Sequence, residues 1–198
     1  MKCPILFCAF FFAVIMARAD DSGPPDSALI KFVQQRTNAV RITEKPVQME
    51  PLVMMRCAVS PQQMRVSQKE RTLGISDPHI KKYVHVYVSP GGEAPMRTWA
   101  GTFPEGTIVL KEKFSDASGT NTELFTGMIK REAGYNPECG NWEFFTLPGD
   151  ASKISMRGKI QDCMECHEEF KSSDFVTKEY VMYTQVLAHH LGPTPIQK

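Results

Sequence analysis

The sequence has little net charge, no long run of charges of one sign, no internal repeat and no long low-complexity tract. A formal net charge of +1 without a basic stripe gives no indication of nucleic-acid binding. Long hydrophobic runs are also scarce, since the extended apolar run at residues 5–16 is too short for a comfortable membrane span. The most informative features are this apolar N-terminus and a small number of cysteines.

Residues 1–19 have the features of a secretory signal peptide. Lys2 supplies a positive start, the apolar run follows, and Ala17 and Ala19 are small residues at the cleavage positions. The mature chain is expected to begin at Asp20, and an uncleaved membrane anchor is the alternative. We therefore expect a periplasmic or otherwise exported protein, in a compartment where disulfides are stable.

The mature chain is expected to form one domain. Residues 20–26 contain Gly23, Pro24 and Pro25 and predict a flexible lead-in. Residues 27–198 are enough for a single domain with a sizeable core.

Alternating hydrophobicity predicts a sheet. Residues 82–88 place Tyr83, His85 and Tyr87 on one face of a strand and three valines on the other. Four further strands are expected, at residues 107–114, 123–131, 141–147 and 152–159. The short turns between them favour antiparallel pairing. The fold class is therefore α+β, with an antiparallel sheet packed with a few helices. Helices are expected after Ser27, near residues 163–167 and over residues 175–189. Two prolines break residues 40–61, where irregular structure or a short strand is expected.

The segment Cys163-Met164-Glu165-Cys166-His167 has the spacing of a c-type haem attachment motif. Two thiols separated by two residues can add to the two vinyl groups of one porphyrin, and the adjacent imidazole can bind the iron. The expected cofactor is thus one covalent haem c, tethered by Cys163 and Cys166 and ligated by His167.

Two different chemistries are also compatible with this cysteine pair. A redox dithiol or disulfide usually follows an early strand of a thioredoxin-like unit, which is not found before Cys163. A zinc site would need two more ligands, and the sequence contains no second closely spaced cysteine pair. The remaining cysteines, Cys57 and Cys139, either pair as a disulfide or stay as separate buried thiols.

The position of the motif argues against two familiar haem proteins. Met182 is the only methionine after His167, whereas small electron-transfer cytochromes usually carry an early motif and a methionine ligand well downstream. A helical-bundle cytochrome c′ is inconsistent with the alternation at residues 82–88. Weaker candidates for an iron ligand are Met54, Met55, His79, His85, His189 and His190.

An ordered set of segments resembles the cytochrome P460 family, which includes the β-sheet cytochromes c′. The segments are residues 85–88 (HVYV), 103–107 (FPEGT), 109–114 (VLKEKF), 128–132 (MIKRE), 135–138 (YNPE), 140–145 (GNWEFF), 157–159 (RGK) and 163–167 (CMECH). The resemblance implies an antiparallel sheet and helices around one c-type haem, His167 as the proximal ligand, and commonly a homodimer. It also implies a small nitrogen-containing ligand, either hydroxylamine that is oxidised with an unidentified redox partner or nitric oxide that is bound reversibly. An electron-transfer cytochrome is a further alternative.

Two more residues take roles from the resemblance. Lys111 matches the lysine that is joined covalently to the porphyrin in the enzymatic members. From the strand pattern alone, Lys111 and Lys113 would simply share a solvated face. Thr126 matches the distal position where hydroxylamine-oxidising members carry a carboxylate. A threonine can hydrogen-bond a ligand but is a poor base at neutral pH, so enzymatic activity is an open question and ligand binding is not affected.

Overall fold

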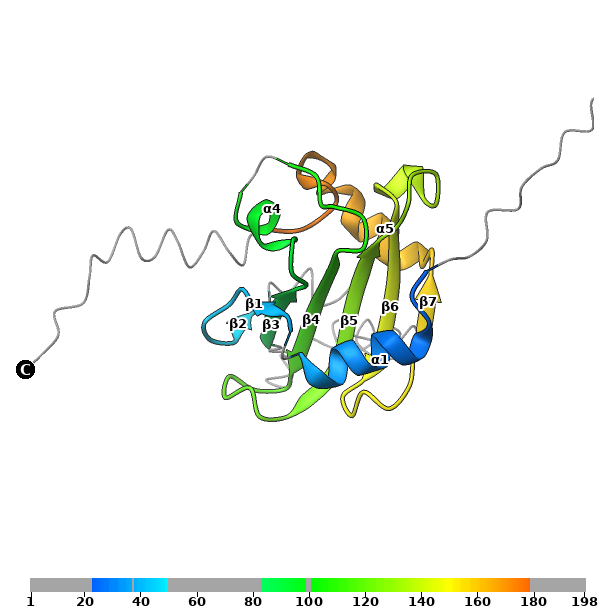
Figure 1. Cartoon of the computed structure of the whole chain (residues 1–198). Helices are drawn as coiled ribbons and strands as arrows, with labels where there is room; N and C mark the ends of the chain where they lie inside the picture. The colour runs from blue at the N-terminus through cyan, green and yellow to red at the C-terminus, as the bar shows by residue number, and fades with distance from the viewer. Residues whose placement is uncertain (1–22, 37, 50–82, 99–100, 179–198) are drawn as a thin grey trace, which may run out of the picture.

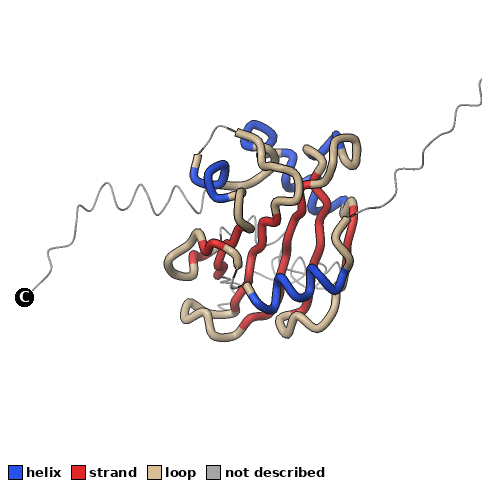
Figure 2. Tube along the Cα trace, in the orientation of Figure 1, coloured by secondary structure: helices blue, strands red, loops and turns tan. Residues whose placement is uncertain are grey.

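The computed structural model describes residues 23–36, 38–49, 83–98 and 101–178. Its centre is an antiparallel sheet of seven strands, in the order β1-β3-β4-β5-β6-β7 with β2 also beside β3 (Figures 1 and 2). The strands are β1 (Val40–Arg41), β2 (Val47–Gln48), β3 (Tyr83–Val88), β4 (Ile108–Phe114), β5 (Thr122–Lys130), β6 (Trp142–Pro148) and β7 (Met156–Gly158). The prediction of an α+β fold with an antiparallel sheet is confirmed.

Short helices cover the sheet. They are α1 (Asp26–Gln35), α4 (Glu93–Arg97) and α5 (Gln161–Glu168), with the 3-10 turns η2 (Pro137–Cys139) and η3 (Lys171–Ser173). Helix α1 crosses one face of the sheet (Figure 1), where its buried Leu29 and Val33 pack against sheet residues such as Phe145. Cys163 and Met164 of α5 pack against the other face. We call these the α1 face and the α5 face.

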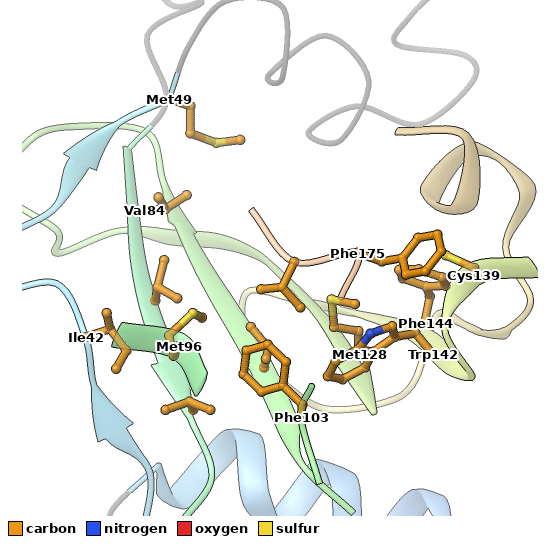
Figure 3. Close-up of a cluster of buried hydrophobic side chains, with 14 residues drawn as sticks. Ile42, Met49, Val84, Met96, Phe103, Met128, Cys139, Trp142, Phe144 and Phe175 are labelled. Carbon is orange, nitrogen blue, oxygen red and sulfur yellow. The ribbon is translucent and has the colours of Figure 1, made fainter. Parts of the chain in front are cut away.

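Both faces of the sheet are buried because each strand alternates between two apolar cores. The core on the α5 face contains Val84, Val86, Val109, Met128, Trp142 and Phe144 (Figure 3). The core on the α1 face contains Tyr87, Leu110, Phe125, Ile129, Phe145 and Leu147. Fully burying one such side chain contributes about 1.5–3 kcal/mol, so two cores on one sheet are a major source of stability.

Gly127 makes room for one of these side chains. It lies directly opposite Phe145 in the β5–β6 ladder. A methyl group added at Gly127 would collide with the Phe145 ring, which covers the glycine backbone. The glycine is therefore a packing requirement of the α1 face.

Several predicted elements differ from the structure. The last predicted strand, 152–159, is reduced to Met156–Gly158. The helix predicted to start at Phe175 does not start there, because Asp174 and Phe175 both adopt left-handed backbone angles, with φ of 57° and 62°. Residues 176–178 are not helical either, and residues 179–189 of that predicted helix lie outside the described residues, as do the signal peptide, Met54 and Met55. Residues 40–48 form two short strands where irregular structure or one strand was expected.

Within the described ranges, none of the helices is long and apolar enough to cross a membrane.

Candidate functional site

Helix α5 carries the three residues of the attachment motif. Cys163, Cys166 and His167 have the i, i+3, i+4 spacing that places side chains on one side of a helix. On the exposed side of α5, the Gln161 side chain donates a hydrogen bond of 2.9 Å to the Glu165 carboxylate. Cys166 is buried, while Cys163 is half-buried against the core of the α5 face. Both thiols and the imidazole thus lie on the same short helix over one face of the sheet.

His167 is held by a backbone carbonyl. Its Nδ1 lies 2.5 Å from the carbonyl oxygen of Phe175, so Nδ1–H donates the hydrogen bond. The ring also contacts Phe144, with ring centroids 5.2 Å apart. A donor proton on Nδ1 leaves the lone pair on Nε2, which is the arrangement of most metal-ligating histidines.

The surroundings keep this imidazole neutral. Burial of the ring, together with the positive charges of Lys111 and Lys113, lowers the pKa of His167 to about 4, although the hydrogen bond to Phe175 acts in the opposite direction. At neutral pH the side chain is therefore unprotonated on Nε2, as binding to iron requires.

The two lysines lie near His167 because β4 directs them toward the α5 face. Lys113 is buried, with 1 % of its surface exposed, and Lys111 is half-buried. A solvated face is the simplest expectation for this pair, and it is wrong for Lys113. The strand alternation itself is confirmed, since Leu110 belongs to the core of the α1 face.

A row of polar side chains crosses the sheet beside α5. Lys111 of β4 pairs with Thr126 of β5, and Thr126 pairs with Thr146 of β6. Directly opposite residues in antiparallel strands have Cβ atoms about 4.5–5.5 Å apart. Lys111 and Thr126 are separate candidates in the sequence, and the sheet brings them together on the α5 face.

Thr146 is not a candidate from the sequence. It is buried, and among the described residues its hydroxyl is the buried side-chain oxygen that makes no hydrogen bond. Such a group normally has a partner, because burying an unpaired hydroxyl is unfavourable. The unsatisfied hydroxyl, the two thiols and the neutral imidazole on the α5 face fit a bound group with polar atoms, as a haem and its ligand would be. Counting across the β5–β6 ladder from Thr126 would find Thr146, but a single sequence does not give the register of that ladder.

His85 lies on the opposite face of the sheet from His167. Its ring contacts Tyr87 and Phe114, and its Nδ1 lies 3.0 Å from the Thr43 hydroxyl. A haem tethered to α5 is therefore on the wrong side of the sheet for His85 to bind its iron. The other candidate histidines, His79, His189 and His190, lie outside the described residues.

Cys139 is a buried thiol at η2. Burial raises the pKa of this thiol to about 11, with a smaller contribution from the charge of Glu168. Cys57 lies outside the described residues, so its pairing with Cys139 stays a prediction. In the described part of the chain, no three His, Cys, Asp or Glu side chains are grouped to hold a metal ion, so the zinc alternative gains no support there.

Comparison with known proteins gives one family. A family model described as Cytochrome P460 matches residues 59–178, which is more than half of the sequence and includes the whole attachment motif. No curated protein matches the chain.

Proposed function

Because this chain belongs to the cytochrome P460 family, which implies a haem cofactor, we propose that it is an exported c-type cytochrome that binds small nitrogen compounds. In this proposal one haem is attached through Cys163 and Cys166, and His167 is the axial ligand of its iron. Nitric oxide or hydroxylamine would be the small molecule that binds at this iron.

The observation that carries the proposal is the hydrogen bond from His167 Nδ1–H to the Phe175 carbonyl. It fixes the tautomer with a lone pair on Nε2, and His167 lies on the same helix as both thiols. Each thiol adds its S–H across one vinyl group, so the two thioethers form without any gain or loss of electrons. When bound, the haem supplies an iron that can bind small ligands and exchange electrons.

Lys111 is the candidate for a third covalent tie to the haem. Joining Nζ to the porphyrin edge removes one hydrogen from the amine and one from a ring carbon, so this bond is a two-electron oxidation. Hydrogen peroxide, as the oxidant, would accept both hydrogens and leave as two molecules of water. The half-buried position of Lys111 and its influence on the pKa of His167 support its proximity to the haem.

The polar row favours ligand binding over fast oxidation of hydroxylamine. Oxidation releases protons, which a carboxylate beside the ligand could accept. Thr126, directly opposite Lys111, and Thr146, opposite Thr126, offer hydroxyls there, and these donate hydrogen bonds but are poor bases. Reversible nitric oxide binding is therefore favoured over hydroxylamine oxidation within this proposal, and simple electron transfer is the second candidate function.

Peptide mass mapping tests the proposal most directly. The full precursor is expressed in a periplasm with haem-attachment machinery, and the peptides that carry haem are identified. We expect haem on the peptide that contains Cys163 and Cys166, and no covalent haem in the variant with both cysteines changed to alanine. A haem that also joins the Lys111 peptide would favour the enzyme, and haem on the cysteines alone would favour the binder. Competently matured protein without haem would overturn the proposal.

A further inference from the structure

The carbonyl that holds His167 belongs to an unusual turn. Asp174 and Phe175 are consecutive residues with left-handed backbone angles, and neither is glycine. This conformation is unfavourable for residues with a Cβ atom and persists only where surrounding contacts maintain it. The contacts around this turn therefore determine where the Phe175 carbonyl points.

A buried ion pair holds the first residue of the turn. Lys130 Nζ lies 2.6 Å from Oδ1 and 2.7 Å from Oδ2 of Asp174, and both side chains are about nine-tenths buried. The backbone N–H of Phe103 donates a further hydrogen bond of 2.7 Å to Oδ2. The Asp174 carboxylate is thus fixed by groups from β5 and from the segment before β4.

The peptide bond that follows Asp174 is also fixed at both of its polar groups. The indole Nε1–H of Trp142 donates to the Asp174 carbonyl at 2.7 Å, and the Phe175 N–H donates to the Phe170 carbonyl at 2.8 Å. Lys130 Nζ lies 5.0 Å from the centre of the Trp142 ring, so this cation contacts both Asp174 and the indole that binds it. Figure 3 shows the Phe175 and Trp142 side chains together at one end of the core of the α5 face.

Gly140 permits this close packing. A methyl group added there would collide with the Phe175 ring and would approach the Asp174 carboxylate to 3.0 Å. Gly140 itself has a φ of 60°, which glycine adopts without strain. The end of η2 is therefore shaped to receive the turn.

We propose that Lys130 and Asp174 are positioning residues for His167, because their ion pair holds the Phe175 carbonyl where it accepts the Nδ1–H hydrogen bond. The inference rests on the proposed function, in which His167 binds iron through Nε2. A hydrogen bond at Nδ1–H makes the imidazole a stronger electron donor to the metal. Stronger donation stabilises the oxidised iron, so the pair lowers the reduction potential of the haem.

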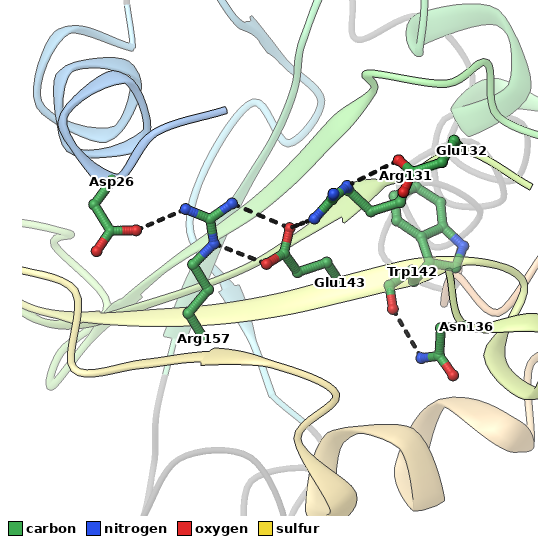
Figure 4. A network of polar contacts seen from close by, with 7 residues as sticks. All are labelled: Asp26, Arg131, Glu132, Asn136, Trp142, Glu143 and Arg157. Atoms are coloured by element: carbon green, nitrogen blue, oxygen red, sulfur yellow. Dashed lines mark hydrogen bonds and ion pairs between the residues drawn. The ribbon is translucent and has the colours of Figure 1, made fainter. Parts of the chain in front are cut away.

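The test uses full-length holoprotein with covalent haem. Asp174→Gly removes the carboxylate while tolerating the left-handed backbone, and Lys130→Met removes the cation with less change to the turn. Arg157→Met is the matched control, since Arg157 also pairs with a buried carboxylate, that of Glu143, but on the α1 face (Figure 4). The measurements are the reduction potential and the iron–histidine stretching frequency of the ferrous protein by resonance Raman spectroscopy.

We expect both Asp174→Gly and Lys130→Met to shift the reduction potential upward and the stretching frequency downward, while Arg157→Met leaves both unchanged. Haem-loaded variants with wild-type potential and frequency would overturn the positioning role, although the proposed function would stand. Equal shifts in Arg157→Met would also overturn it, since they would reflect general loosening. If Asp174→Gly fails to fold, Lys130→Met decides the question. Absence of covalent haem from the wild-type protein would instead overturn the proposed function.

Discussion

Lys111 and Thr126 face each other directly across the β4–β5 ladder, and Thr146 continues the same row on β6. The row lies on the face of the sheet that receives α5, and Lys111 is close enough to His167 to lower its pKa. Residues from three strands and one helix therefore come together at the candidate haem site.

Removing the unsatisfied hydroxyl of Thr146 tests whether it serves a bound ligand. Thr146→Val keeps the shape of the side chain and removes its hydrogen-bond donor. If the hydroxyl donates to a ligand at the iron, nitric oxide should dissociate from the ferrous variant roughly fivefold faster, because one hydrogen bond is worth about 1 kcal/mol. Stopped-flow kinetics measure the rate. The control is Thr122→Val, whose hydroxyl binds Glu112 instead. An identical rate in Thr146→Val and wild type would contradict this role.

His167→Gly separates attachment from ligation. The thioethers at Cys163 and Cys166 should still hold the haem, but the ferrous absorption spectrum should change because the axial imidazole is lost. Added imidazole should restore a spectrum close to wild type, since the space left by the side chain can admit it. An unchanged spectrum before imidazole addition would show that another group ligates the iron.

His85 should make the protein less stable in mild acid. Burial and the charge of Arg41 lower the pKa of His85 below 6.5, while Glu112 and Thr43 act in the opposite direction. Below pH 6.5 the unfolded chain takes up a proton that the folded protein resists, so the free energy of unfolding decreases as the pH falls. Urea unfolding at pH 7.5 and 5.5 should show this decrease, and His85→Gln should reduce it. An equal decrease in the variant would assign the effect to other groups.

Glu143 should be important for stability. Its carboxylate is buried and receives Arg131 at 2.6 Å and Arg157 at 2.8 Å (Figure 4). Glu143→Ala leaves two guanidinium groups without this partner and should cost about 3–5 kcal/mol of unfolding free energy. Glu132, which is more exposed and pairs with Arg131 at 3.2 Å, provides the control. Glu132→Ala should cost less than about 1 kcal/mol in the same urea titration. Similar losses in both variants would contradict the importance of burial.

Local pattern is enough to predict strands β3 to β6 and the helix that carries the motif. The alternation of residues 82–88 and the spacing of Cys163, Cys166 and His167 are short-range signals, and β3 and α5 agree with them. The helix expected from residue 175 is a short-range prediction too, and its start is wrong. The Asp174 carboxylate, which could have capped such a helix, binds Lys130, 44 residues away.

The remaining parts of the site depend on register and distant contacts. Thr146 lies beside Thr126 only because β5 and β6 pair with that alignment, which a single sequence does not specify. The burial of Lys113 likewise depends on what packs over the α5 face, whereas lysine in a strand is usually solvated. Sequence pattern predicts which residues share a face but not which face is covered.

The packing of α1 against late parts of the chain has a consequence for the order in which the protein folds. Gln34 hydrogen-bonds the Ala151 carbonyl, and Asp26 pairs with Arg157, 131 residues further along the chain. Helix α1, the first described helix to leave the ribosome, therefore cannot complete these contacts until β7, the last described strand, has been synthesised. Contacts between residues so far apart in the sequence slow folding. Until they form, the apolar side of α1 is exposed and can bind other apolar surfaces. A chain that is exported before it folds would postpone this step until α1 and β7 are in the same compartment.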